Sequence, residues 1–153
     1  MAFQQRTVGS VFQINLGDNK FAYGQILDKG YVFFDYPFEK RIEDIDILMD
    51  CNTLFIVMVY KDVITSKRWE KIGKIPIRES LKILPMKFIQ DSIDSSKFSL
   101  YNPNTGEITP CKKEDCIGLE RAAVWEGSHV EDRIRDHYNG VPNIWTNQLA
   151  IKE

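Results

Sequence analysis

The stretch Val11-Phe-Gln-Ile-Asn-Leu16 decides the fold class, because its apolar and polar residues alternate one by one. A period of two is the pattern of a half-buried β-strand, whose successive side chains point to opposite faces. A turn cluster, Gly17-Asp-Asn19, separates this strand from a second one expected over residues 20–27. Asp28-Lys-Gly30 then turns the chain into a third, aromatic-rich strand over residues 31–36. The opening third therefore predicts an antiparallel meander, the start of a bent sheet or a small barrel.

Within the second strand, Gly24 predicts either a bulge or a place where another segment comes close. The clearest buried strand is Leu54-Phe-Ile-Val-Met-Val-Tyr60, which is uncharged and rich in β-branched and aromatic residues. Residues 38–50 fit a short amphipathic helix, although Ile45 and Ile47 also fit a strand. Further extended segments are expected at 69–77 (a loop or strand pair), 87–93, 97–101, 107–109 and 121–125.

The C-terminal part predicts a helix over residues 129–138. Ser128-His-Val-Glu131 has the spacing of a capping box, and Val130, Ile134 and Tyr138 repeat every four residues on one stripe. Asn139-Gly140 supplies the stop signal. The whole pattern predicts an α+β fold: β-rich, with antiparallel strands in a bent sheet or small barrel and a C-terminal helix. At this length a single domain over residues 1–153 is expected.

Composition narrows the class of protein. With 43% hydrophobic residues and a formal net charge of −2, the chain can build a core and is not a general binder of phosphate backbones. Residues 1–10 lack the apolar run of a secretory signal, and the longest apolar stretch is too short to span a bilayer. We therefore expect a cytoplasmic protein without a membrane partner.

The near-neutral total hides segments of opposite charge. Residues 28–50 carry a net −4, residues 61–87 a net +5 and residues 91–153 a net −4. Each segment is either a solvated face or a docking surface that steers a partner of opposite sign. The candidate docking residues are acids of the first segment: Glu39, Glu43, Asp44, Asp46 and Asp50.

The basic segment 61–87 supports an alternative, a small-barrel nucleic-acid-binding module. Its stretch Lys67-Arg-Trp-Glu-Lys71 interleaves bases with an aromatic residue, as single-strand binders do. Trp69 could instead be a core or lid residue, and we expect this role rather than the stacking of a nucleic-acid base.

Catalytic and metal-binding signatures are absent from the sequence, so no catalytic residue, metal or cofactor is predicted. Cys111 and Cys116 flank four residues, which is not the gap of a zinc knuckle, and with Cys51 they are expected to be ordinary thiols. His129 is expected to be neutral and structural at the start of its helix. The acids Glu126, Glu131, Asp132 and Asp136 are expected to form solvated ion pairs with Arg133 and Arg135.

Three separated segments resemble the immunity protein 26 family. The first is Val8-Gly-Ser-Val-Phe-Gln-Ile-Asn-Leu16 with Phe21-Ala-Tyr-Gly-Gln-Ile-Leu27. The second is Trp69-Glu-Lys-Ile-Gly-Lys-Ile-Pro-Ile77. The third is Cys116-Ile-Gly-Leu-Glu-Arg-Ala-Ala-Val-Trp125, followed by His129-Val-Glu-Asp-Arg133. Their order, from about residue 8 to about residue 138, carries the resemblance.

The resemblance implies an immunity protein of a bacterial polymorphic-toxin system. Such a protein would bind and block a cognate toxin inside the producing cell and would not be an enzyme. The matched residues are mostly glycine, tryptophan and apolar types, so they imply a fold more than a contact surface. No site residue is carried over, and the toxin, the contacting face and the oligomeric state are left open.

Overall fold

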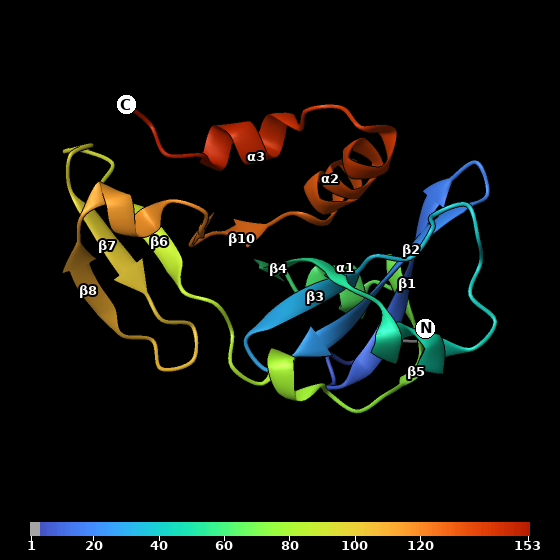
Figure 1. Ribbon diagram of the computed structural model, residues 1–153. Coiled ribbons are helices and arrows are strands. Elements are labelled where there is room, and N and C mark those ends of the chain that lie inside the picture. Colours follow the sequence, from blue (N-terminus) through green and yellow to red (C-terminus); the bar gives the residue numbers. More distant parts are fainter. Residues whose placement is uncertain (1–3) are drawn as a thin grey trace.

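Two β-sheets organise the chain, as the computed structural model of residues 4–153 shows (Figure 1). The larger sheet has the strand order β10-β4-β3-β2-β1-β5, and the smaller one has the order β8-β7-β6-β9. The larger sheet contains β1 (Ser10–Gly17), β2 (Lys20–Leu27), β3 (Gly30–Phe34), β4 (Thr53–Val59), β5 (Trp69–Lys74) and β10 (Val124–Trp125). The smaller sheet contains β6 (Lys87–Gln90), β7 (Phe98–Tyr101), β8 (Ile108–Cys111) and β9 (Glu120–Arg121).

Short helices connect and cover these sheets. The α-helices are α1 (Asp62–Thr65), α2 (Gly127–Asn139) and α3 (Ile144–Leu149), and the 3₁₀ helices are η1 (Ile45–Asp50), η2 (Glu79–Leu81) and η3 (Lys113–Cys116). None of the helices in residues 4–153 is long and apolar enough to cross a membrane. The predicted α+β fold is confirmed, and of the two shapes left open the structure has open sheets and no closed barrel.

The predicted meander is confirmed by the pairing of β1 with β2 and of β2 with β3, both antiparallel. The first turn is tight because Asp18 and Asn19 adopt left-handed backbone angles, with φ of 53° and 59°. Positive φ at both central residues is what a two-residue hairpin turn requires, and Asp and Asn tolerate it better than most residues.

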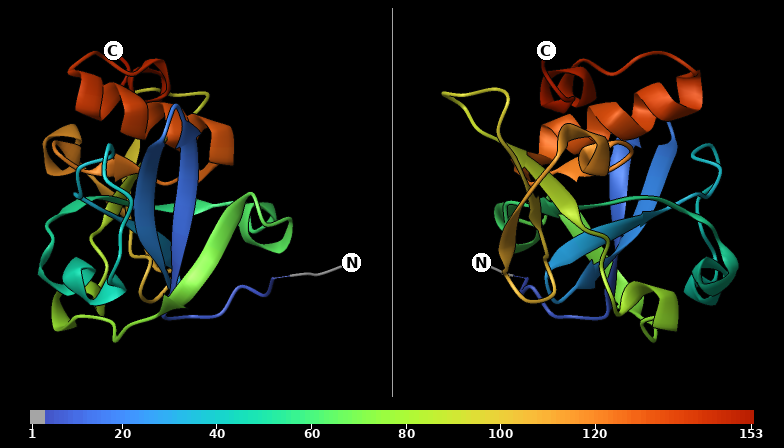
Figure 2. Two further views of the ribbon diagram at one scale, coloured as in Figure 1. Left: turned by 90° about the vertical axis from the view of Figure 1, so that its right-hand side faces the viewer. Right: turned by 60° about the vertical axis from the view of Figure 1, so that its left-hand side comes forward.

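The central strands β2 and β3 are buried on both faces. On one face, Phe12, Ile26 and Phe33 pack with residues of α2 in the largest core cluster. On the other face, Tyr23 and Val32 pack with η1 and η2 in a second cluster. Figures 1 and 2 show the sheet between these two layers. The sequence pattern could not reveal the second layer, because its residues come from later segments.

Gly24 is the close approach that the sequence predicted. A Cβ atom added there would lie 2.5 Å from the carbonyl oxygen of Val32 and would also overlap the ring of Phe12. Only glycine therefore allows the Phe12 ring to cross β2 at this point.

The smaller sheet is tied to the larger one by the segment 120–125. The predicted last strand over residues 121–125 is in fact two short strands, of which β9 pairs with β6 and β10 pairs with β4. Both of these pairings are parallel. One short segment therefore contributes to both sheets. The strand β4, predicted as fully buried, has only Val57 and Val59 buried, because it lies next to the edge of its sheet.

Helix α2 confirms the predicted C-terminal helix, but the predicted capping box is wrong. The helix begins at Gly127, two residues earlier than expected, and no side chain caps its N-terminus. Glu131 cannot reach back to cap it, because its carboxylate is engaged with Arg68 and Trp69. The C-terminal stop is as expected, with Gly140 in the left-handed conformation at φ 67°.

Two helical elements, η1 and α3, differ from what the sequence predicted. The helix predicted within residues 38–50 is reduced to η1, and residues 38–44 carry no helix. Helix α3 was not predicted, although Asn143 gives a local signal. Its side chain accepts a hydrogen bond from the amide of Thr146 at 2.9 Å and thereby caps the helix.

Candidate functional site

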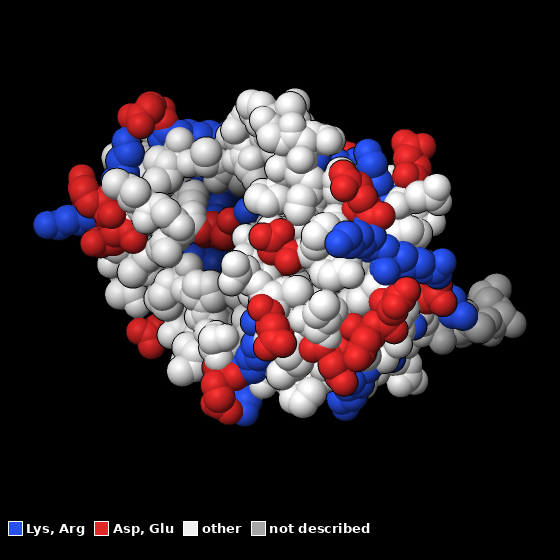
Figure 3. Space-filling model, turned by 45° about the vertical axis from the view of Figure 1, so that its right-hand side comes forward, with Lys and Arg blue, Asp and Glu red and all other residues white. Residues whose placement is uncertain are grey.

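The acidic loop, residues 39–50 between β3 and β4, contains all five acids predicted as docking residues. Glu39, Glu43, Asp44, Asp46 and Asp50 are all exposed. Four of them line one open hollow of about 780 Å³, together with Tyr36, Lys40, Arg41, Ile42 and Ile47, and Glu39 lies outside it. Figure 3 shows acidic side chains gathered on this face, with basic side chains beside them. The structure therefore brings most of the predicted set together, although two cations share the hollow.

Buried groups hold the acidic loop in place. Leu48 is fully buried beneath η1 and packs in the second core cluster. The amide of Ile42 donates to the hydroxyl of Tyr23 at 2.8 Å. Arg78 donates from Nη1 to the carbonyl oxygens of Met49 and Cys51 at 3.3 and 2.8 Å. These contacts fix the backbone of the loop at its start and its end.

A further anchor comes from α2. The hydroxyl of Tyr138 accepts a hydrogen bond from the amide of Tyr36 at 3.1 Å and lies 2.9 Å from the Tyr36 carbonyl oxygen. Burial, reinforced by the neighbouring carboxylate of Asp35, raises the pKa of Tyr138, so its hydroxyl stays protonated and can donate. Sequence reasoning missed the anchors Tyr23, Arg78 and Tyr138, because they come from distant segments and carry no motif.

The carboxylates of the acidic loop are left without cations of their own. Within residues 4–153, none of the five predicted acids forms an ion pair. Asp44 uses one oxygen to accept from the amide of Asp46 at 3.0 Å, which caps η1. Neither cation of the hollow, Lys40 or Arg41, forms an ion pair with these acids in the described residues, and Arg41 lies over the ring of Phe21. The loop therefore presents unpaired negative charge on a fixed backbone.

Several bases of the segment 61–87 are engaged within the fold. Arg78 is directed to carbonyl oxygens, Lys82 pairs with Glu79 at 2.6 Å, and Lys87 is buried. Trp69 is fully buried, as expected, and stacks on Phe12. A fully buried indole has no free face on which a nucleic-acid base could stack. The structure therefore gives the nucleic-acid alternative no support.

Glu131 is the most buried carboxylate among the ion pairs of the described residues. Its carboxylate accepts from Arg68 Nε and Nη2 at 2.7 and 3.0 Å and from Trp69 Nε1 at 2.9 Å. The side chain is only 8% exposed. The prediction of a solvated ion pair is wrong for Glu131, because the helix turns this residue toward the core. It holds for Asp132, which is half exposed and pairs with Arg135 at 3.2 Å.

The histidines and cysteines do not assemble into a reactive site in residues 4–153. His129 stacks on Trp145 with ring centroids 3.5 Å apart, and His137 meets the edge of Tyr138. The Sγ atoms of Cys111 and Cys116 are 3.6 Å apart, and both thiols are free. Burial raises the pKa of Cys116 to about 11, which disfavours its thiolate at neutral pH. No group of three or more acidic, histidine or cysteine side chains in this range could hold a metal ion.

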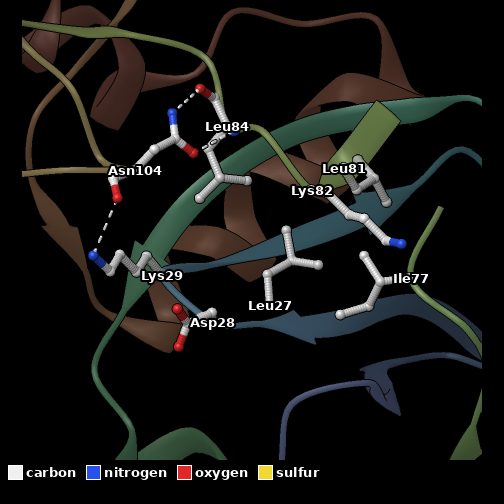
Figure 4. A pocket seen from close by; sticks show the side chains of 8 residues that line it. All are labelled: Leu27, Asp28, Lys29, Ile77, Leu81, Lys82, Leu84 and Asn104. Carbon is white, nitrogen blue, oxygen red and sulfur yellow. Dashed lines mark hydrogen bonds between the residues drawn. The ribbon is translucent and has the colours of Figure 1, made fainter. Parts of the chain in front are cut away.

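A smaller pocket of about 260 Å³ lies where the two sheets meet (Figure 4). Leu27, Ile77, Leu81 and Leu84 form its apolar part, and Lys29 and Lys82 stand beside it. Asn104 closes one side by accepting from the Leu84 amide at 2.7 Å and donating to the Leu84 carbonyl oxygen at 2.9 Å. This pair of bonds attaches the β7–β8 turn to the segment between η2 and β6, which gives the pocket a structural explanation.

The fold and its surface define a class of protein: a β-rich scaffold that presents an anchored, charged loop and is suited to binding a partner. The chain belongs to the immunity protein 26 family, whose family model matches residues 7–99, more than half of the chain. This places it among immunity proteins, a class that is in general non-enzymatic. The match includes the first two of the three resembling segments, and the third lies beyond it. Searches of curated proteins and of solved structures found no match.

Proposed function

We propose that this protein binds a cognate polymorphic toxin in the cytoplasm of the producing bacterium and neutralises it. The family match over residues 7–99 is the observation that carries this proposal. The chain would act as one domain, which the shared segment 120–125 supports by joining the two sheets. A protein of this kind needs a stable scaffold and a surface complementary to its toxin, and it needs no chemistry of its own.

We propose further that the acidic loop is the docking surface and that the toxin meets it with a basic face. Its carboxylates are exposed and free of intramolecular ion pairs in the described residues, so binding would not have to break such pairs. Because buried side chains hold its backbone, little ordering entropy would be lost on binding. Opposite charge also steers association, raising rate constants toward about 10⁸–10⁹ M⁻¹s⁻¹ at low salt. A nuclease whose cleft binds phosphates would present such a basic face.

Co-expression tests the immunity role. The toxic domain encoded beside this gene is expressed in a sensitive strain with and without this protein. Rescue of growth and co-purification of the two proteins are the expected results. Failure of both would refute the immunity role for that toxin.

Charge reversal tests the docking surface separately. The variant Glu43→Lys with Asp50→Lys changes two exposed acids of the hollow whose carboxylates accept no hydrogen bond within residues 4–153. We expect the association rate constant to fall by about tenfold or more at low salt, and the difference to shrink as salt is added. The matched control reverses Glu70 of β5 and Glu114 of η3, which are exposed and whose carboxylates likewise accept no hydrogen bond within the described residues. Equal effects of both variants would refute the docking surface and leave the immunity role intact.

A further inference from the structure

Lys87 is a buried lysine beside a hollow between the two sheets. The residue is only 6% exposed, although lysine is among the residues least often buried. Its strand β6 alternates, so that Phe88 points into the third core cluster and Lys87 points to the opposite face. On that face Lys87 lies across from Tyr101 of β7 and lines a hollow of about 340 Å³. Figure 1 shows β6 and β7 beside the chain segment that leads into β10.

No group in residues 4–153 neutralises this ammonium directly. Lys87 forms no hydrogen bond and no ion pair there, and only a longer-range attraction to Glu120 favours its charge. Glu120 sits opposite Lys87 on β9, but its two carboxylate oxygens accept from the guanidinium of Arg133 at 3.0 and 2.8 Å. Burial of the Lys87 side chain disfavours its charged form and lowers its pKa.

The hollow itself is suited to an anion with a short apolar body. Its lining contains two lysines, Lys29 and Lys87, and no carboxylate. Among the other lining residues only Tyr101 has a polar side-chain group, and the rest are Met58, Pro103, Ala122, Ala123 and Val124. The Lys29 ammonium has only a long contact, 3.4 Å, to the carbonyl oxygen of Asn104. The volume is at the lower end of the range of about 300–1,000 Å³ that small-molecule sites occupy.

We propose that this hollow binds a small carboxylate, with the carboxylate at Lys87 and Lys29 and the apolar body against Met58 and Val124. A carboxylate fits better than a phosphate, because the lining offers two cationic groups and is otherwise mostly carbon. The carboxylate could belong to a free small molecule or to an acidic residue of a bound protein. The site goes beyond the proposed immunity function and does not depend on it.

Butyrate is the probe, and butyramide is the matched neutral control. Protein labelled with ¹³C-lysine is titrated at neutral pH while the Cε resonances are followed by NMR, with Lys87→Met used to assign the Lys87 signal. Butyrate should move the Lys87 signal saturably, and butyramide and an equal concentration of chloride should not. Lys29→Met should weaken butyrate binding by about tenfold, through the loss of one charged contact. Lys97→Met, which changes an exposed lysine in the connection between β6 and β7, should leave butyrate binding unchanged.

Three results would overturn the proposal: a Lys87 signal that butyrate does not move, a Lys87 signal that butyramide moves equally, or tighter binding of inorganic phosphate than of butyrate. The shifts are measured on the unmodified protein, and Lys87→Met serves only to identify the Lys87 signal.

The same titration of the toxin complex separates the two sources of carboxylate. If the toxin supplies the carboxylate, the Lys87 signal will already be shifted and butyrate will not move it. If a free molecule supplies it, the complex will respond to butyrate as the free protein does. Loss of toxin binding altogether would refute the immunity role and leave the carboxylate site standing.

Discussion

Replacing Glu131 with alanine tests the contact that joins α2 to β5. This carboxylate receives three hydrogen bonds, two from Arg68 and one from the fully buried Trp69. When the carboxylate is removed, Arg68 and Trp69 differ in whether their N–H groups can bond to water instead. The Arg68 side chain is 49% exposed and can return to water, whereas the indole N–H of Trp69 cannot.

The expected loss of stability follows from this difference. An exposed ion pair contributes about 0–1 kcal/mol, so the Arg68 contacts account for the smaller part. A buried donor left without an acceptor costs about 1–3 kcal/mol. We therefore expect Glu131→Ala to lower the free energy of unfolding by about 3 kcal/mol, a large part of the roughly 5–15 kcal/mol that stabilises a typical domain. Glu131→Gln keeps an acceptor for Trp69 and should cost about 1 kcal/mol.

Equilibrium unfolding in urea measures these losses, followed by far-ultraviolet circular dichroism so that the signal does not depend on Trp69. The control is Glu126→Ala, because the Glu126 side chain is 65% exposed and caps nothing. It should change stability by no more than about 0.5 kcal/mol. A loss below about 1 kcal/mol for Glu131→Ala, or equal losses for the alanine and glutamine variants, would refute the reasoning about the indole bond.

Three further predictions follow from backbone packing, burial and thiol chemistry. Gly24→Ala should lower the free energy of unfolding by about 2–3 kcal/mol through overpacking against Phe12. Gly30→Ala, where an added methyl group meets its nearest atom at 3.5 Å, should be nearly neutral in the same urea titration. Lys87→Met should stabilise the protein at neutral pH, because burial lowers the pKa of Lys87 and the folded state disfavours the charged form. Its advantage should fade as the pH rises toward the ordinary lysine pKa of 10.5, and a constant difference in unfolding free energy would contradict this. Cys116, whose pKa is raised to about 11, should react with a thiol reagent only after unfolding, whereas Cys51 and Cys111 should react earlier. Mass spectrometry of labelled peptides measures the order of reaction, and early labelling of Cys116 would contradict the prediction.

Much of the fold could be predicted because its signals are local. The alternation in residues 11–16, the Asp18-Asn19 turn and the Asn139-Gly140 stop each depend on neighbours in the chain, and each is found in the structure. The short strands β9 and β10 could not be separated, since a strand of two residues has no periodicity to detect. The capping box failed for a different reason, because Glu131 has a stronger partner from β5 than its own helix N-terminus.

The candidate site divides in the same way. The negative charge of residues 39–50 was predicted from composition. The acidic side chains lie around one hollow because Leu48 and Tyr23 hold the loop from beneath. The basic segment 61–87 has the larger net charge in the sequence, yet the fold engages several of its bases. Arg68 pairs with Glu131, Arg78 donates to carbonyl oxygens, and Lys87 lines the hollow between the sheets.

The β-rich α+β fold, the order of the early strands, the C-terminal helix and the family could therefore be predicted from the sequence. They depend on periodicity, turn residues and ordered similarity, all of which are found along the chain. Which charges are paired, buried or free became evident in the folded structure alone. Those properties depend on which distant segments meet, because the energy of a charge is set by the water and the partners around it. Glu131 and Asp132 are adjacent in the sequence, and one is buried against Trp69 while the other is half exposed.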